Sequence, residues 1–211
     1  MSRLQPLPPE TTPELKSHFD FFLGTHGFTP NSVLTMQRKP RMVQAFAQLN
    51  AAVMDPSGDV DQGFRRLIGH VVSKVSGCLY CQAHTLLGAQ NFGISEAKLA
   101  DVWTYASSPH YSLRERLAMD FALAASSQPN AVTDASFAEL QQHWSDNEIV
   151  EILGVVAMFA FLNRWNDTMA TPLEAPAANV AVQAFATGHW VMVQQPQEFN
   201  QAVLSWLQGK R

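Results

Sequence analysis

Charged side chains are scarce in this chain of 211 residues. Asp, Glu, Lys and Arg together account for 15% of the residues, whereas an average soluble domain contains about 25%. Hydrophobic residues make up 46%, so a chain of this length can bury a sizeable core and is too apolar to be disordered. The shortage of charge indicates that part of the surface is buried between subunits, and we expect a homo-oligomer.

Basic runs are missing as well. The chain contains 14 Lys and Arg against 18 Asp and Glu, which gives a formal net charge of −4. A protein that binds nucleic acid usually carries a basic patch, and binding to an anionic membrane depends on the same attraction. The sequence therefore predicts no nucleic-acid partner and no membrane partner.

Long apolar stretches are also absent. The most apolar segment, residues 149–162, contains Glu151 and is shorter than the roughly 20 apolar residues that span a bilayer. We therefore predict that it forms a buried core helix. The N-terminal segment has three prolines by position 9 and no apolar stretch, which is unlike a signal peptide. We expect a cytoplasmic protein.

Strand signals are nearly absent, and helix signals take their place. Apolar residues at helical spacing, separated by glycine and proline breaks, predict helices over residues 14–23, 40–53, 59–75, 78–90 and 96–105. Two capping boxes, Ser112 with Glu115 and Ser145 with Glu148, mark the starts of two further helices. The sequence therefore predicts an all-α fold.

These helices are expected to form a single domain over residues 1–175. Residues 176–211, which include Trp190 and Trp206, are predicted to form a C-terminal helical arm that packs on the same domain or on a neighbouring subunit. A group of aromatic residues near the N-terminus is interpreted as core or subunit interface rather than as part of a substrate site. It comprises Phe19, Phe21, Phe22 and Phe28.

Cys78 and Cys81 are the two cysteines of the chain, and their spacing points to chemistry. A disulfide between them would close almost no loop, so it would add little stability. If a helix begins at Cys78, both thiols lie in its first turn, where free N–H groups and the helix dipole lower a thiol pKa. His84 follows Cys81 by three residues on the same helix face and can exchange a proton with it. This placement favours Cys81 as the attacking thiol and Cys78 as the resolving one.

Two other interpretations of the pair remain open. The cysteines can be half of a zinc site, but four ligands are usual and the chain has no second cysteine pair. Cys78, Cys81 and His84 would supply three ligands. The thiols can also be inert and buried. The spacing favours redox chemistry over both.

The segment GCLYCQAHT, residues 77–85, resembles the signature of the alkylhydroperoxidase / carboxymuconolactone decarboxylase superfamily, in its thiol-bearing, peroxidase-related branch. Two further segments are similar to others of that family: GFTPNS at residues 27–32 and FLNRWND at residues 161–167. The resemblance therefore covers about residues 20–175.

The resemblance implies a single-domain orthogonal helical bundle of the alkylhydroperoxidase-like type, assembled as a dimer, trimer or hexamer. It also implies that Cys81 attacks a hydroperoxide and that Cys78 closes a disulfide. His84 then takes the place of the family's proton-relaying histidine. No metal, flavin or haem cofactor is implied, and the electron donor is expected to be a dithiol on a lipoyl-bearing or thioredoxin-like protein.

The sequence departs from the family pattern in two places. His84 follows Cys81 by three residues, whereas the better-known members have four. The position of the family's relay glutamate, about twelve residues before the cysteine motif that begins at Cys78, falls at Arg66, which cannot act as a base. These departures put the usual proton relay in doubt.

Other side chains can complete the relay. His70 lies one helical turn after Arg66, and it approaches the thiols if two helices fold back on each other at residues 76–77; a purely structural helix contact is the alternative. Arg66 can favour a thiolate or lie in solvent beside Arg65. Glu151 is either a buried catalytic carboxylate or a partnered structural acid.

The sequence therefore predicts thiol-dependent reduction of hydroperoxides, in which Cys81 attacks the peroxide and Cys78 captures the resulting sulfenic acid. Three alternatives are a disulfide reductase or redox sensor without peroxidase activity, a decarboxylase-like enzyme acting on a small lactone acid, and a non-catalytic oligomeric binding protein. The cysteine pair argues against the decarboxylase, because that branch does not depend on it.

Overall fold

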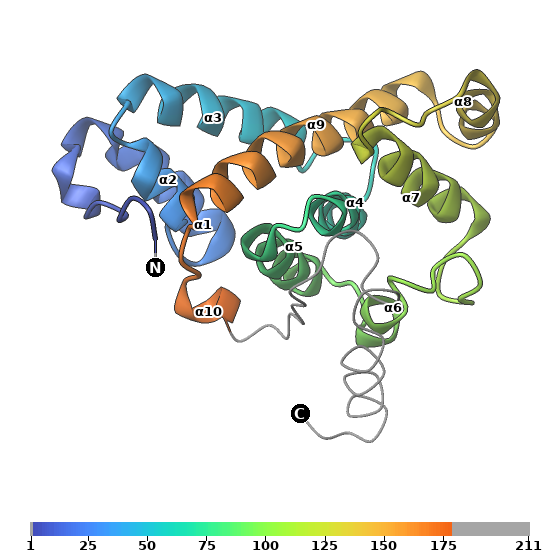
Figure 1. The fold of residues 1–211 in the computed structure, drawn as a ribbon, viewed down its shortest axis with the longest axis horizontal. Coiled ribbons are helices and arrows are strands. Elements are labelled where there is room, and N and C mark those ends of the chain that lie inside the picture. Colours follow the sequence, from blue (N-terminus) through green and yellow to red (C-terminus); the bar gives the residue numbers. More distant parts are fainter. Residues whose placement is uncertain (1, 179–211) are drawn as a thin grey trace. The chain divides into compact units, whose positions relative to one another are not determined.

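A computed structural model of the protein describes residues 2–178, which form helices and connecting turns without a strand (Figure 1). The predicted all-α fold is confirmed. Two short 3₁₀ turns, Pro9–Thr11 and Pro13–Leu15, precede ten α-helices. They are α1 Lys16–His26, α2 Asn31–Met36, α3 Pro40–Val53, α4 Gln62–Val75, α5 Leu79–Asn91, α6 Glu96–Ala100, α7 Leu113–Ser126, α8 Asp134–Gln141, α9 Asp146–Met169 and α10 Ala175–Ala178.

Helix α4 forms the centre of the fold. It packs against α5, α7 and α9, and Figure 1 shows it nearly end-on between them. Every residue from Gly63 to Ser73 is buried, as expected for a helix that is enclosed on all sides. Gly69 allows Phe159 of α9 to approach closely, because a Cβ atom there would lie 2.6 Å from the Phe159 ring.

The local signals of the sequence are found at the helix ends. Both predicted capping boxes are formed, with Glu115 and Glu148 each returning a hydrogen bond to its cap residue. Two predicted helices have different bounds in the structure. Helix α1 begins at Lys16 after a 3₁₀ turn rather than at residue 14, and α6 ends at Ala100 rather than at residue 105. The predicted C-terminal arm lies outside the described residues, apart from residues 176–178.

Helix α9 is the predicted apolar helix, but it is buried on one face only. Ile152, Val155 and Phe159 lie in the core, whereas Val150, Leu153 and Phe161 are 69%, 45% and 40% exposed. These three exposed residues are spaced so that they share one side of the helix, and we call them the α9 stripe. No helix within residues 2–178 is both long and apolar enough to cross a membrane. An exposed apolar stripe is typical of a contact between protein subunits, which supports the expectation of a homo-oligomer.

We expect Leu153→Glu to lower the molar mass measured by size-exclusion chromatography with light scattering, because a buried, unpaired carboxylate disfavours subunit contact. The helical circular dichroism spectrum should remain unchanged. Leu113→Glu is the matched control, since Leu113 is 57% exposed at the start of α7. A Leu153→Glu protein with the mass of the wild type would contradict the prediction that subunits contact each other through the α9 stripe.

Candidate active site

The turn between α4 and α5 places both cysteines. Gly77 adopts φ 75°, a left-handed conformation that glycine accepts at no steric cost. The Cys78 N–H then donates to Ser73 O at 3.0 Å, so the chain reverses at once and α5 begins. Cys78 is the N-cap residue of α5, so the helix begins at Leu79, one position after the predicted start, and Cys81 lies in the first turn as expected.

The two thiols are reduced and almost fully buried, at 1% and 2% exposed. The Cys81 N–H donates to Cys78 Sγ at 3.5 Å, and Asn166 Nδ2 of α9 donates to Cys81 Sγ at 3.3 Å. Hydrogen bonds from the Cys81 thiol and N–H lower the pKa of Cys78. Burial raises the pKa of Cys81 well above its usual value, and the adjacent Cys78 adds to this. The predicted lowering of both pKa values therefore holds for Cys78 but not for Cys81.

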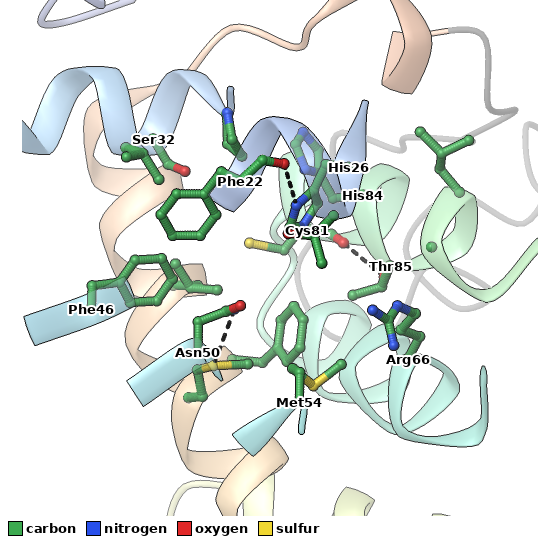
Figure 2. A pocket seen from close by; sticks show the side chains of 18 of the residues that line it. Phe22, His26, Ser32, Phe46, Asn50, Met54, Arg66, Cys81, His84 and Thr85 are labelled. Atoms are coloured by element: carbon green, nitrogen blue, oxygen red, sulfur yellow. Dashed lines mark hydrogen bonds between the residues drawn. The ribbon is translucent and has the colours of Figure 1, made fainter. Parts of the chain in front are cut away.

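A pocket of about 400 Å³ opens beside the pair. Of the two cysteines, Cys81 lines the pocket and Cys78 does not. Figure 2 shows Cys81 between Phe22 and Phe46 on one side and Thr85 and Arg66 on the other. Seven phenylalanine and tyrosine rings contribute to the wall, those of Phe21, Phe22, Phe28, Phe46, Tyr80, Phe92 and Phe159. The pocket has the size and apolar character of a small-molecule site.

All four N-terminal phenylalanines were expected to serve as core or interface. Phe19 and Phe22 are buried core residues, and Phe21, Phe22 and Phe28 line the pocket. Phe22 stacks on Phe46 of α3 with ring centroids 5.8 Å apart. The sequence alone could not distinguish these roles, because helical spacing shows which face is apolar but not what that face contacts.

His84 lines the same pocket as Cys81, as its spacing predicted. Its ring stacks on Tyr80 with centroids 4.2 Å apart and meets the edge of Phe28 at 5.4 Å. The hydrogen bond recorded for its side chain goes from Nε2 to Glu174 Oε2, at 2.6 Å. Because Nε2 is occupied by the carboxylate, Nδ1 is the nitrogen left for proton exchange.

Glu174 is the residue of this site that the sequence analysis missed. Its carboxylate accepts hydrogen bonds from His84 Nε2, from Tyr80 Oη at 2.7 Å and from the Asn31 N–H. Burial opposes its charge, but these hydrogen bonds together hold the pKa of Glu174 below its usual value. Asn31 Nδ2 also donates to Pro172 O at 3.0 Å, which fixes the segment that carries Glu174. An ionised carboxylate therefore lies directly behind His84.

Arg66, at the position of the family glutamate, also lines the pocket and is 8% exposed. Its guanidinium lies over the Phe92 ring, 3.5 Å from the centroid. Burial lowers the pKa of Arg66 to about 10, so the side chain keeps its charge at neutral pH. The alternative of a solvent-exposed arginine pair is excluded, because Arg65 is buried as well and donates to Val53 O and Asp55 O.

The two other predicted relay candidates lie elsewhere. His70 is buried at the contact of α4 with α5, where Nδ1 donates to Gln82 O at 3.1 Å and lies 3.2 Å from Thr85 Oγ1. Glu151 accepts from the N–H groups of Asp59 and Val60 and so holds the loop before α4. Among the described residues that line the pocket, neither side chain is found. The contacts of His70 and Glu151 fit the structural alternatives.

A zinc site would need further ligands beside the cysteines and His84. Within residues 2–178 no three His, Cys, Asp or Glu side chains gather in a metal-binding arrangement. The donor set fits proton and electron exchange between two thiols and an imidazole, since His84 is already engaged with Glu174.

Comparison with known proteins agrees with the motif. The sequence model of the Carboxymuconolactone decarboxylase family matches residues 40–124, which include both cysteines and His84. The chain is also 30% identical to the debrominase Bmp8, with a TM-score of 0.77 over 82% of this chain and 93% of that protein. The chain belongs to the carboxymuconolactone decarboxylase family. The predicted resemblance is thereby confirmed.

Two further proteins are similar to this chain, one in structure and one in sequence. A peroxidase-related protein from Ralstonia eutropha with an alkylhydroperoxidase AhpD core is 25% identical, with a TM-score of 0.73 over 83% of this chain and 94% of its own. The uncharacterized protein YnjA of Escherichia coli is 28% identical over 115 residues, 54% of this chain. That match spans 63% of YnjA, less than two thirds of its length. The family thus includes a debrominase and peroxidase-related proteins.

The buried neutral state of His70 predicts a pH dependence of stability. Burial lowers the pKa of His70 from 6.5 to about 4, so the unfolded chain binds a proton that the folded protein resists. The free energy of unfolding should therefore decrease as the pH falls from about 6.5 to about 4, by about 2–3 kcal/mol from this residue. His70→Asn keeps a donor near Nδ1 but does not titrate, and should flatten this decrease in urea unfolding experiments.

The exposed His143→Asn is the control and should leave the decrease as it is in the wild type. An equally steep decrease in His70→Asn would show that another group causes it. If His70→Asn instead lost catalytic turnover and left the pH dependence of the free energy of unfolding unchanged, His70 would belong to the proton relay.

Proposed function

We propose that this protein reduces organic hydroperoxides with Cys78 and Cys81, which alternate between two thiols and a disulfide. The observation that carries the proposal is the reduced pair beside an aromatic pocket of about 400 Å³, with Cys81 on the pocket wall. Hydrogen peroxide needs no such volume, whereas an apolar pocket of this size fits the carbon body of an organic substrate.

The first step is the transfer of a proton within the pair. Hydrogen bonds from Cys81 lower the pKa of Cys78, and burial raises the pKa of Cys81, so a negative charge on the pair is favoured on Cys78 over Cys81. Because Cys81 faces the pocket, Cys78 acts as the local base and takes the proton of Cys81 when substrate binds. The Asn166 Nδ2–H group, 3.3 Å from Cys81 Sγ, then stabilises the Cys81 thiolate.

The thiolate attacks the distal oxygen of the hydroperoxide. A bond forms between sulfur and that oxygen, the O–O bond breaks, and the remaining alkoxide receives a proton from His84 to become the alcohol. The Cys78 sulfur then attacks the Cys81 sulfenic acid, which releases water and leaves a disulfide. The sum is one hydroperoxide and two thiols converted to one alcohol, one water and one disulfide.

In this chain Arg66 stands at the position of the family's relay glutamate, and Glu174 supplies the supporting carboxylate instead. Its carboxylate, 2.6 Å from His84 Nε2, orients the ring and stabilises the protonated imidazole that donates from Nδ1. An external dithiol must reduce the disulfide for the next turnover. By the resemblance, a lipoyl-bearing or thioredoxin-like protein supplies it.

The roles of the two cysteines can be tested with single variants and cumene hydroperoxide. In Cys78→Ser, we expect oxidation to stop at a sulfenic acid on Cys81, which dimedone traps and intact mass spectrometry detects. In Cys81→Ser, the remaining Cys78 should stay unmodified over the same time. Trapping on Cys78 in the second variant would reverse the assignment, and a wild type whose thiols survive as long as free cysteine would overturn the proposal.

A second candidate reaction is reductive debromination, and the similarity to a debrominase favours it. A debrominase variant in complex with 2,3,4-tribromopyrrole is 29% identical to this chain, with a TM-score of 0.79 over 84% of it. Such a reaction also consumes two thiols: sulfur takes the bromine, the ring carbon takes a proton, and the second sulfur displaces bromide to form the disulfide. Bromide released from 2,3,4-tribromopyrrole, compared with alcohol formed from cumene hydroperoxide, distinguishes the two activities.

We expect Glu174→Gln to lower kcat for the preferred substrate by about tenfold to a hundredfold, because His84 loses the charge that stabilises its protonated form. Steady-state kinetics measure this effect.

Tyr80→Phe is the matched control, because it removes one donor to Glu174 and leaves the contact with His84. It should change kcat by less than about threefold. Equal losses in both variants would assign the network a structural role only.

A further inference from the structure

Arg66 is a buried charge without a counter-ion. It is 8% exposed, and the hydrogen bond recorded for its guanidinium goes from one terminal nitrogen to Gln62 O at 2.9 Å. A guanidinium has five N–H donors. No ion pair of Arg66 with an Asp or Glu is found among residues 2–178. Since an unpaired buried charge is unfavourable, the protein maintains this one against a free-energy cost.

The side chain is held in a defined position on the pocket wall. The Phe92 ring lies against its guanidinium at 3.5 Å, which provides a cation–π contact. Helix α5 leaves room for the chain at Gly88, where a Cβ atom would lie 2.8 Å from Arg66 Cδ. Figure 2 shows Arg66 below Thr85, in the pocket that Cys81 also lines. The positive charge is thus held in a defined position in the same pocket as the reacting sulfur.

The histidines of the pocket do not supply a competing charge. Burial and the neighbouring His84 together lower the pKa of His26 to about 4, so His26 is neutral at neutral pH. His84 is balanced by Glu174, which lies 2.6 Å from it. The positive charge that faces the cavity is therefore that of Arg66.

The carboxylates near this part of the pocket are occupied. Asp55 lies at the exposed rim, where the Ser57 N–H and hydroxyl donate to its Oδ1 at 2.8 Å and 2.7 Å. Asp61 caps α4 by accepting from the Phe64 N–H at 2.8 Å. Neither forms an ion pair with Arg66, so the guanidinium remains available to a bound anion.

We propose that Arg66 binds a carboxylate on the substrate, and that the pocket therefore selects organic acids. The apolar body of such a substrate lies against the phenylalanines, and its reducible group lies at Cys81. A planar guanidinium matches a carboxylate with two parallel hydrogen bonds. This assignment specifies the substrate class of the proposed function and rests on it for the reaction, but not for the binding.

The test is a binding experiment on the full-length reduced protein that requires no turnover. Isothermal titration calorimetry compares 2-naphthoate with 2-naphthamide, which has nearly the same shape and no charge. We expect 2-naphthoate to bind at least about tenfold more tightly. Arg66→Gln should remove that preference by weakening 2-naphthoate and leaving 2-naphthamide within about twofold.

Two further variants make the result specific. Gly88→Ala displaces the Arg66 side chain and should also weaken 2-naphthoate, whereas Arg41→Gln removes an exposed positive charge on α3 and should leave both affinities unchanged. If Arg66→Gln fails to fold, the comparison of the two ligands in the wild type and in Gly88→Ala still decides.

Equal affinities for the two ligands in the wild type, binding of neither, or an equal loss of both in Arg66→Gln would each overturn the assignment. The outcome is separate from that of the proposed function. A protein that binds 2-naphthoate through Arg66 but leaves hydroperoxides intact would retain this inference and lose the activity. A protein that reduces cumene hydroperoxide and ignores the carboxylate would do the reverse.

Discussion

Burial of the hairpin formed by α4 and α5 is the constraint on which the rest of the site depends. Because much of these two helices lies inside the fold, several of their ionisable groups lose contact with water. The same desolvation raises the pKa of Cys81 and lowers the pKa of His70 and Arg66. The hydrogen bonds that remain, such as those to Cys78 Sγ, then decide which group carries charge.

Two opposite charges flank the pocket and have separate tasks in the proposed reaction. The carboxylate of Glu174 lies behind His84, where it supports proton transfer, and the guanidinium of Arg66 lies on the wall, where it is available to the substrate. A glutamate in place of Arg66 would bring a negative charge to that wall. In the proposed reaction, the carboxylate of Glu174, which follows α9, supports proton transfer. The pocket wall at Arg66 then carries no negative charge that would repel a bound anion.

Much of the fold could be predicted because its signals are local. The capping boxes and the turn at Gly77 are encoded within a few residues of one another, and the spacing of Cys78, Cys81 and His84 follows from the helix period. Glu174 could not be predicted, because its bond to His84 joins residues 90 positions apart and no periodicity reports such a contact. The raised pKa of Cys81 could not be predicted for the same reason, since the helices that bury this thiol are distant in sequence.

The near-complete enclosure of the cysteine pair, at 1% and 2% exposure, has a consequence for how electrons arrive. In the proposed cycle, the rim of a globular thioredoxin-like donor does not reach either sulfur without opening the fold, whereas a dithiol at the end of a flexible arm, as on a lipoyl-bearing protein, can enter the pocket. We therefore expect the rate of disulfide reduction to depend on the shape of the donor as well as on its reduction potential.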